Sequence, residues 1–182
     1  MRFLTILFLI IFVAAAWADD KPGFAVVIAT DKADTEFRFR VYDPEGFEVD
    51  WGTGRGWEKA WLGKPTLMLP RDSTDETTGT AYLIGARYAK PGKYTVRMRG
   101  TVSRVSFFGT YSTECTPWLL RDVVAPVSDG LEGVKSAKDM FREAKNIPTE
   151  FTARDWLSAS SKDVKESENV FDGTARAVEV VK

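Results

Sequence analysis

The chain of 182 residues contains no histidine and a single cysteine, Cys115. Without histidine, the Ser-His-Asp and Cys-His catalytic arrangements are excluded, as are zinc sites with imidazole ligands. One cysteine cannot build an internal disulfide framework, so packing must stabilise the fold. Because no imidazole can activate Cys115, a small semi-buried residue is favoured over a reactive thiol. These absences predict a protein that is not an enzyme and has no catalytic residues.

An excess of either charge is also lacking. The 25 Lys and Arg residues nearly balance the 26 Asp and Glu residues, and no basic cluster dominates, so a nucleic-acid partner is not expected. A carboxylate-dependent hydrolase is the least favoured alternative, because no two acids pair in a recognisable motif. Asp72, Asp75 and Glu76 do not follow the spacing of a calcium loop. We therefore expect no metal and no other cofactor.

The one long hydrophobic run lies at the N-terminus. Arg2 precedes the apolar segment FLTILFLIIFVAAA, and Ala16 and Ala18 supply the small residues of a cleavage site. The run is short for a membrane span of about 20 residues, so an uncleaved anchor is the less favoured alternative. We expect residues 1–18 to form a signal peptide cleaved after Ala18. The mature chain would then have no membrane span and would be secreted, periplasmic or at the cell surface.

Apolar and polar residues alternate along much of the chain between residues 24 and 107. The segment YTVRMR at 94–99 changes at every position, as a strand does when one face is buried and the other is solvated. About seven short strands with turns between them predict a two-sheet β-sandwich over residues 19–108. The expected strands are 24–29, 36–42, 47–51, 66–69, 80–84, 94–99 and 102–107.

Two segments of this region carry a family resemblance. The motif VDWGTG at 49–54 and the segment YAKPGKYTVRMRG at 88–100 resemble the PKD-like β-domain of BspA-type leucine-rich-repeat surface proteins of bacteria. Thr53 stands where that family usually has Asp, and Ala86 where it often has His, so the hydrogen bonds of the turns differ here. The resemblance implies an Ig/PKD-like sandwich to which no catalytic residues are assigned.

Residues 109–182 show a different pattern. The segments 134–144 and 164–174 are two versions of one pattern, in which Val134 corresponds to Val164 and Phe141 to Phe171. The near-helical spacing of their apolar residues predicts a short helix with one buried face in each copy. Both copies resemble the BspA-type repeat, which implies a mainly β protein with a short helical repeat tail. Two unrelated amphipathic helices are the alternative.

The candidate binding residues are aromatic and basic. Trp57 and Trp61 lie close to Arg55 in the segment WGTGRGWEKAW. Exposed aromatic residues beside an arginine favour a protein-binding hot spot or a platform for stacking sugar rings. Alternatively, the first Trp of the segment is core and the other two cover the end of the sandwich. Arg97 and Arg99 contribute to a basic, solvated strand face that suits an acidic partner.

We therefore expect an exported, non-enzymatic, adhesion-like protein. The resemblance implies a protein partner at the cell envelope or the host surface, recognised through residues 55–61 and the exposed face of the repeats. The alternative is a carbohydrate-binding module that stacks sugar rings on Trp57 and Trp61.

Overall fold

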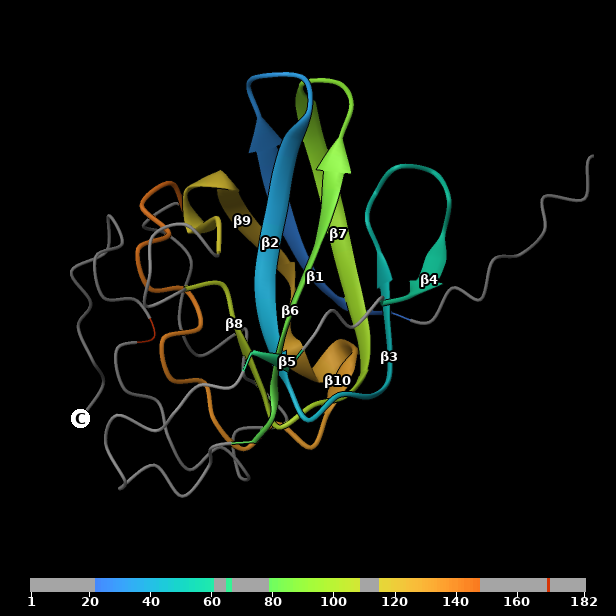
Figure 1. The fold of residues 1–182 in the computed structure, drawn as a ribbon, viewed down its shortest axis with the longest axis vertical. Helices are drawn as coiled ribbons and strands as arrows, with labels where there is room; N and C mark the ends of the chain where they lie inside the picture. Colours follow the sequence, from blue (N-terminus) through green and yellow to red (C-terminus); the bar gives the residue numbers. More distant parts are fainter. Residues whose placement is uncertain (1–21, 61–64, 67–78, 109–114, 148–169, 171–182) are drawn as a thin grey trace, which may run out of the picture.

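The computed structural model describes residues 22–60, 65–66, 79–108, 115–147 and 170 (Figure 1). The expected signal peptide, Trp61 and all of the second repeat copy except Val170 lie outside these residues. Within the described ranges, no helix is long and apolar enough to cross a membrane.

Two β-sheets face each other (Figure 1). The first sheet has the order β4-β3-β7-β1-β9, with β10 paired to β7, and the second has the order β5-β6-β2-β8. All neighbouring strands are antiparallel except β10 and β7. The first sheet comprises β1 (Phe24–Thr30), β3 (Glu45–Asp50), β4 (Trp57–Lys59), β7 (Gly92–Thr101), β9 (Leu120–Ala125) and β10 (Leu131–Glu132). The second comprises β2 (Thr35–Tyr42), β5 (Pro65–Thr66), β6 (Ala81–Tyr88) and β8 (Arg104–Ser106). This arrangement confirms the prediction of a mainly β protein with a sandwich of two sheets.

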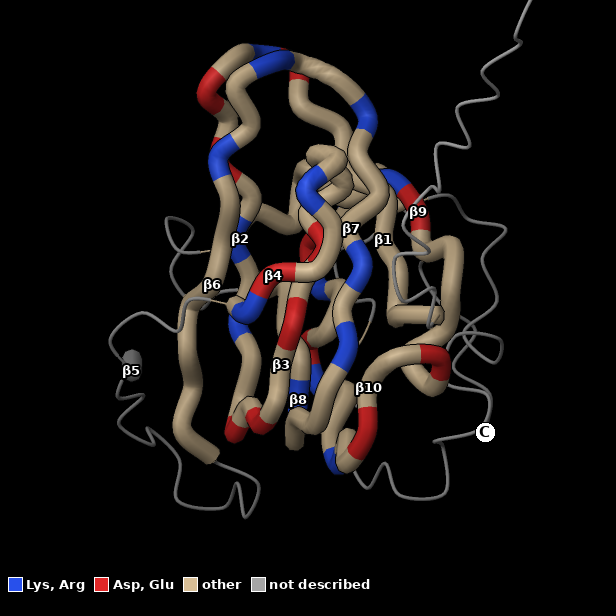
Figure 2. The backbone as a smooth tube through the Cα atoms, turned by 90° about the vertical axis from the view of Figure 1, so that its right-hand side faces the viewer, with Lys and Arg blue, Asp and Glu red and all other residues tan. Residues whose placement is uncertain are grey.

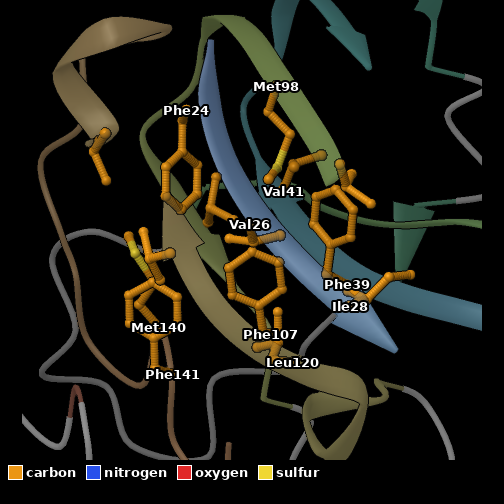
Figure 3. Close-up of a cluster of buried hydrophobic side chains, with 14 of the residues drawn as sticks. Phe24, Val26, Ile28, Phe39, Val41, Met98, Phe107, Leu120, Met140 and Phe141 are labelled. Carbon is orange, nitrogen blue, oxygen red and sulfur yellow. The ribbon is translucent and has the colours of Figure 1, made fainter. Parts of the chain in front are cut away.

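The alternating residues of the strands form the core. Phe37, Phe39 and Val41 of β2 are fully buried and face the first sheet, whose β1 contributes apolar side chains to the same core. The ring of Phe107 lies at the centre, with its centroid 5.2 Å from that of Phe39 and 5.5 Å from that of Phe141 (Figure 3). Aromatic contacts therefore join the second sheet to a segment that follows the sheets in sequence.

Residues beyond position 108 extend the first sheet and the core. β9 pairs with β1 in antiparallel orientation, and β10 pairs with β7 at Leu131↔Gly100. Short 3-10 helices, η1 (Pro117–Leu119) and η2 (Val127–Asp129), flank β9. The apolar residues of this part belong to the same cluster as those of the earlier strands: Leu120, Val123, Val127, Leu131, Met140 and Phe141. β9 was not predicted, because its residues were assigned to the repeat tail.

The helix predicted over residues 134–144 is wrong. Residues 138–143 form turns and Ser136 forms an isolated bridge with Arg104. Asp139 (φ 55°) and Glu143 (φ 61°) adopt left-handed backbone conformations that interrupt a right-handed helix. The backbone of the segment also forms hydrogen bonds with other segments. For example, the Phe107 N–H donates a hydrogen bond of 2.9 Å to the Met140 carbonyl. The apolar residues are buried as the spacing suggested, but in turns packed on the sandwich. A helical repeat tail is therefore not found within the described residues.

Candidate functional site

Trp57 lies on β4 at the edge of the first sheet and is half-buried. The guanidinium carbon of Arg99 lies 4.3 Å from the centroid of its ring, in a cation–π arrangement. A Cβ atom added to Gly23 would lie 2.7 Å from Cη2 of the same ring, so the edge of the ring covers the backbone there. The indole therefore lies between Arg99 and the backbone just before β1.

Arg99 is held from a second side by a carboxylate. Glu48 of β3 and Arg99 of β7 are directly opposite in register. Both Nε and Nη2 of Arg99 lie 2.7 Å from Oε2 of Glu48. The two side chains are 20% and 28% exposed, so solvent screens the pair incompletely. We call Trp57, Arg99 and Glu48 the Trp57 cluster, a rigid aromatic and ionic group on the outer face of the first sheet. A groove of about 420 Å³ borders its charged pair.

Arg97 lies two residues from Arg99 on the same outer face and is exposed. The residue opposite it is Asp50, whose Oδ1 accepts a hydrogen bond of 2.9 Å from the Gly52 N–H. Arg97 forms no ion pair with any residue that the structure describes. Figure 2 shows basic residues along β7 beside acidic residues on β3. Arg97 is therefore a cation of this face whose charge remains available.

Arg55 is not part of this face. It is exposed on the loop between β3 and β4 and lines a separate cleft of about 280 Å³ between β4 and β6. The structure thus brings Trp57, Arg97 and Arg99 together and places Arg55 elsewhere, while Trp61 lies outside the described residues. The alternating sequence places Glu48 on a solvated face but does not reveal its pairing with Arg99, which depends on the register of β3 and β7.

Trp51 is a core residue, as the alternative interpretation of the sequence had it. Its side chain is 9% exposed, and its ring centroid lies 6.0 Å from that of Phe39. The buried Tyr88 hydroxyl donates a hydrogen bond of 3.0 Å to the Trp51 carbonyl. Burial of the phenol raises the pKa of Tyr88 well above its ordinary value, so the hydroxyl stays protonated and remains a donor. This bond fixes the end of β3 against β6.

Nucleophilic or metal chemistry finds little support in the described part of the chain. Cys115 is buried, and burial raises the pKa of its thiol to about 11, although Arg40 and Arg38 oppose the shift. At neutral pH the thiol is therefore protonated and a poor nucleophile. The described residues contain no group of three or more Cys, Asp and Glu side chains arranged to hold a metal ion.

Comparison with known proteins found no matching family model, curated protein or solved structure. The resemblance to BspA-type surface proteins therefore stays a prediction from the sequence motifs.

Proposed function

We propose that this is an exported, non-enzymatic protein whose Ig/PKD-like sandwich binds a protein partner at the cell envelope or the host surface. The observation that carries the proposal is the Trp57 cluster with the exposed Arg97 beside it. Export is supported by the signal-like segment 1–18 in the sequence.

The composition of this face suits a protein interface. Tryptophan and arginine are the residues most enriched where binding energy is concentrated, and rigid side chains lose little conformational entropy on binding. Trp57 and Arg99 hold each other in place before any partner arrives, and Glu48 neutralises Arg99. Arg97 is unneutralised by the described residues, so an acidic group of a partner would complement it.

Carbohydrate binding is the second candidate and is favoured by the half-exposed indole of Trp57. A sugar ring stacks on the open face of an aromatic side chain. Arg99 covers one face of this indole at 4.3 Å, which reduces the area that a sugar could contact. For this reason we place glycan recognition after protein recognition.

The test is affinity capture from envelope and host-matrix extracts on the immobilised mature chain, with a glycan array probed in parallel. We expect a protein that the wild type retains and that Arg97→Gln and Trp57→Ala lose at least about tenfold, equivalent to about 1.4 kcal/mol. Lys135→Gln is the matched control, because Lys135 is an exposed cation outside this face. Equal retention by Arg97→Gln and wild type would refute a role for this face, and a glycan signal lost with Trp57 would favour the carbohydrate module.

A further inference from the structure

Among the described residues, the strand β6 has one paired edge and one edge that is largely unpaired. Along β2 it is paired at every residue from Ala81 to Tyr88. On the other edge it pairs with β5 only at Ala81 and Tyr82. From residue 83 to 87, no strand among the described residues pairs with that edge. Alternate N–H and C=O groups of such a strand point away from its neighbour, so this edge can accept a further strand.

The cleft between β4 and β6 lies along this open edge. Residues 84–87 of β6 form one wall, and residues of β4 and of the loop before it form the other. The cleft measures about 280 Å³, and its buried members Trp51 and Ile84 give it an apolar bottom. In Figure 2, β4 and β6 are seen at neighbouring edges of the two sheets. We call this site the β4–β6 cleft.

The rim of the β4–β6 cleft carries more positive than negative charge. Arg55, Lys59 and Arg87 are exposed cations of the lining, and Glu58 is its acidic residue. Each of these four side chains lacks an ion pair with the residues that the structure describes. Unpaired cations around an apolar bottom attract a ligand that is negatively charged at its edges and apolar at its centre.

The bottom of the cleft is tied to β6 before a ligand binds. Gly52, Gly54 and Gly56 adopt positive φ angles of 71°, 85° and 76°, which return the chain tightly from β3 to β4. The Tyr88 hydroxyl bonds to the Trp51 carbonyl and ties the bottom of the cleft to β6. A preformed cleft binds with a smaller entropic cost than one that must be ordered by its ligand.

We propose that the β4–β6 cleft binds an extended acidic segment of a partner protein as an additional strand on β6. The backbone of that segment pairs with the open edge at residues 83–87. Its alternate side chains point inward and outward, so small apolar residues face Trp51 and Ile84 while Asp or Glu residues face the basic rim. This surface is separate from the Trp57 cluster, and the proposal holds or fails independently of the function proposed for that cluster.

The test uses fluorescein-labelled peptides of alternating Glu and Val residues, with fluorescence anisotropy measured against the whole mature chain. A peptide of alternating Lys and Val is the charge control. A Glu-Val peptide that is N-methylated at every residue keeps the charges but has no backbone N–H to donate on either edge. We expect binding of the unmodified Glu-Val peptide alone, weakened by salt. Binding of the Lys-Val peptide or of the N-methylated peptide at the same affinity would overturn the proposal.

Substitutions then locate the peptide on the protein. Arg55→Glu and Arg87→Gln should each weaken binding, the charge reversal by at least about tenfold and the neutral change by about threefold. Lys135→Glu is the control and should leave the affinity unchanged, because Lys135 lies outside the lining of the cleft. If Arg97→Gln weakens peptide binding and Arg55→Glu does not, the peptide binds the Trp57 face and the cleft proposal is wrong.

Discussion

At the scale of single residues, the VDWGTG motif shows what its glycines and its aspartate do. Asp50 accepts a hydrogen bond from the Gly52 N–H, as expected for an aspartate that caps a turn. Gly52 has φ +71°, and a Cβ atom at this position would lie 2.5 Å from the Thr95 carbonyl oxygen. Gly54 has φ +85°, but a Cβ atom there would meet nothing within 4 Å. A side chain at position 54 would therefore meet backbone strain alone, whereas one at position 52 would meet both strain and a steric collision.

The first prediction concerns these two glycines. Gly54→Ala should lower the free energy of unfolding by about 1 kcal/mol, because alanine is strained at a positive φ. Gly52→Ala should cost about 3 kcal/mol or more, because the methyl group also collides with the backbone of β7. Urea unfolding of both variants measures the difference. Equal losses for the two variants would mean that β7 moves aside at little cost.

The second prediction concerns Cys115 and pH. In the folded protein burial raises the pKa of the thiol from its ordinary value of 9.0 to about 11. Above pH 9 the unfolded chain releases this proton while the folded protein keeps it, so stability falls as pH rises from about 9 to 11. Below the lower value both states are protonated, and the full stability is present.

The measurement is urea unfolding of wild type and Cys115→Ala at about pH 8 and pH 10.5. Between these values wild type should lose roughly 1–2 kcal/mol more than the variant, because the variant has no thiol to ionise. Tyr88 is present in both proteins, so its contribution at alkaline pH cancels in the comparison. Parallel pH profiles of the two proteins would contradict the prediction.

At the scale of elements, a strand can be predicted from the sequence where its apolar residues form a clear pattern. Alternation predicts β2, β3 and β7, because one face of each strand is buried in the core. Short apolar runs predict β1 and the first part of β6 instead. β4 has three residues, Trp57–Lys59, which is too short to show a period. The sequence pattern does not reveal β9, because the apolar residues around it also fit the predicted repeat region.

The segment 134–144 shows why burial can be predicted when the element cannot. Val134, Ala137, Met140, Phe141 and Ala144 are all buried, and their spacing of three or four residues is typical of a helix. In this protein, turns bury apolar residues at this same spacing. The left-handed conformations of Asp139 and Glu143, which exclude the helix, leave no signal in the residue types.

The sequence predicts which residues form the candidate site better than it predicts how they are arranged. Trp57, Arg97 and Arg99 were identified from residue type and alternation, but the pairing of Arg99 with Glu48 requires the register of two strands. The sequence does not point to Arg87, because Arg87 lies on β6 of the second sheet and Arg55 on the loop between β3 and β4, and the two line the same cleft only in the folded protein. Long-range juxtaposition of this kind is set by the tertiary fold and cannot be inferred from local periodicity.

At the scale of the whole molecule, one hydrophobic core spans the described residues on both sides of position 108. Six Val, Leu, Met and Phe side chains after that position are at most 2% exposed: Leu120, Val127, Leu131, Val134, Met140 and Phe141. Burial of such a side chain contributes about 1.5–3 kcal/mol, whereas a domain is stable by only about 5–15 kcal/mol in total. The strands before position 108 therefore depend on the residues that follow them.

The last prediction follows from this dependence. A chain ending at residue 108 loses β9 and leaves an edge of β1 unpaired, together with the apolar surface that the six side chains cover. We expect residues 19–108 to show no cooperative urea transition, whereas residues 19–182 unfold cooperatively. A cooperative transition of similar midpoint in the shorter chain would instead establish an independent domain ending at 108.

Because truncation also disturbs the backbone, point substitutions in β9 provide the sharper form of the test. Leu120 is fully buried and Val124 is 53% exposed, and both lie on this one strand. In the mature chain Leu120→Ala should cost about 2–5 kcal/mol, whereas Val124→Ala should change stability by less than about 0.5 kcal/mol. A large loss at position 120 in the transition of the whole sandwich would mean that β9 is part of the cooperative unit. If Leu120→Ala instead left the main transition unchanged, the first sheet would be stable without its last long strand.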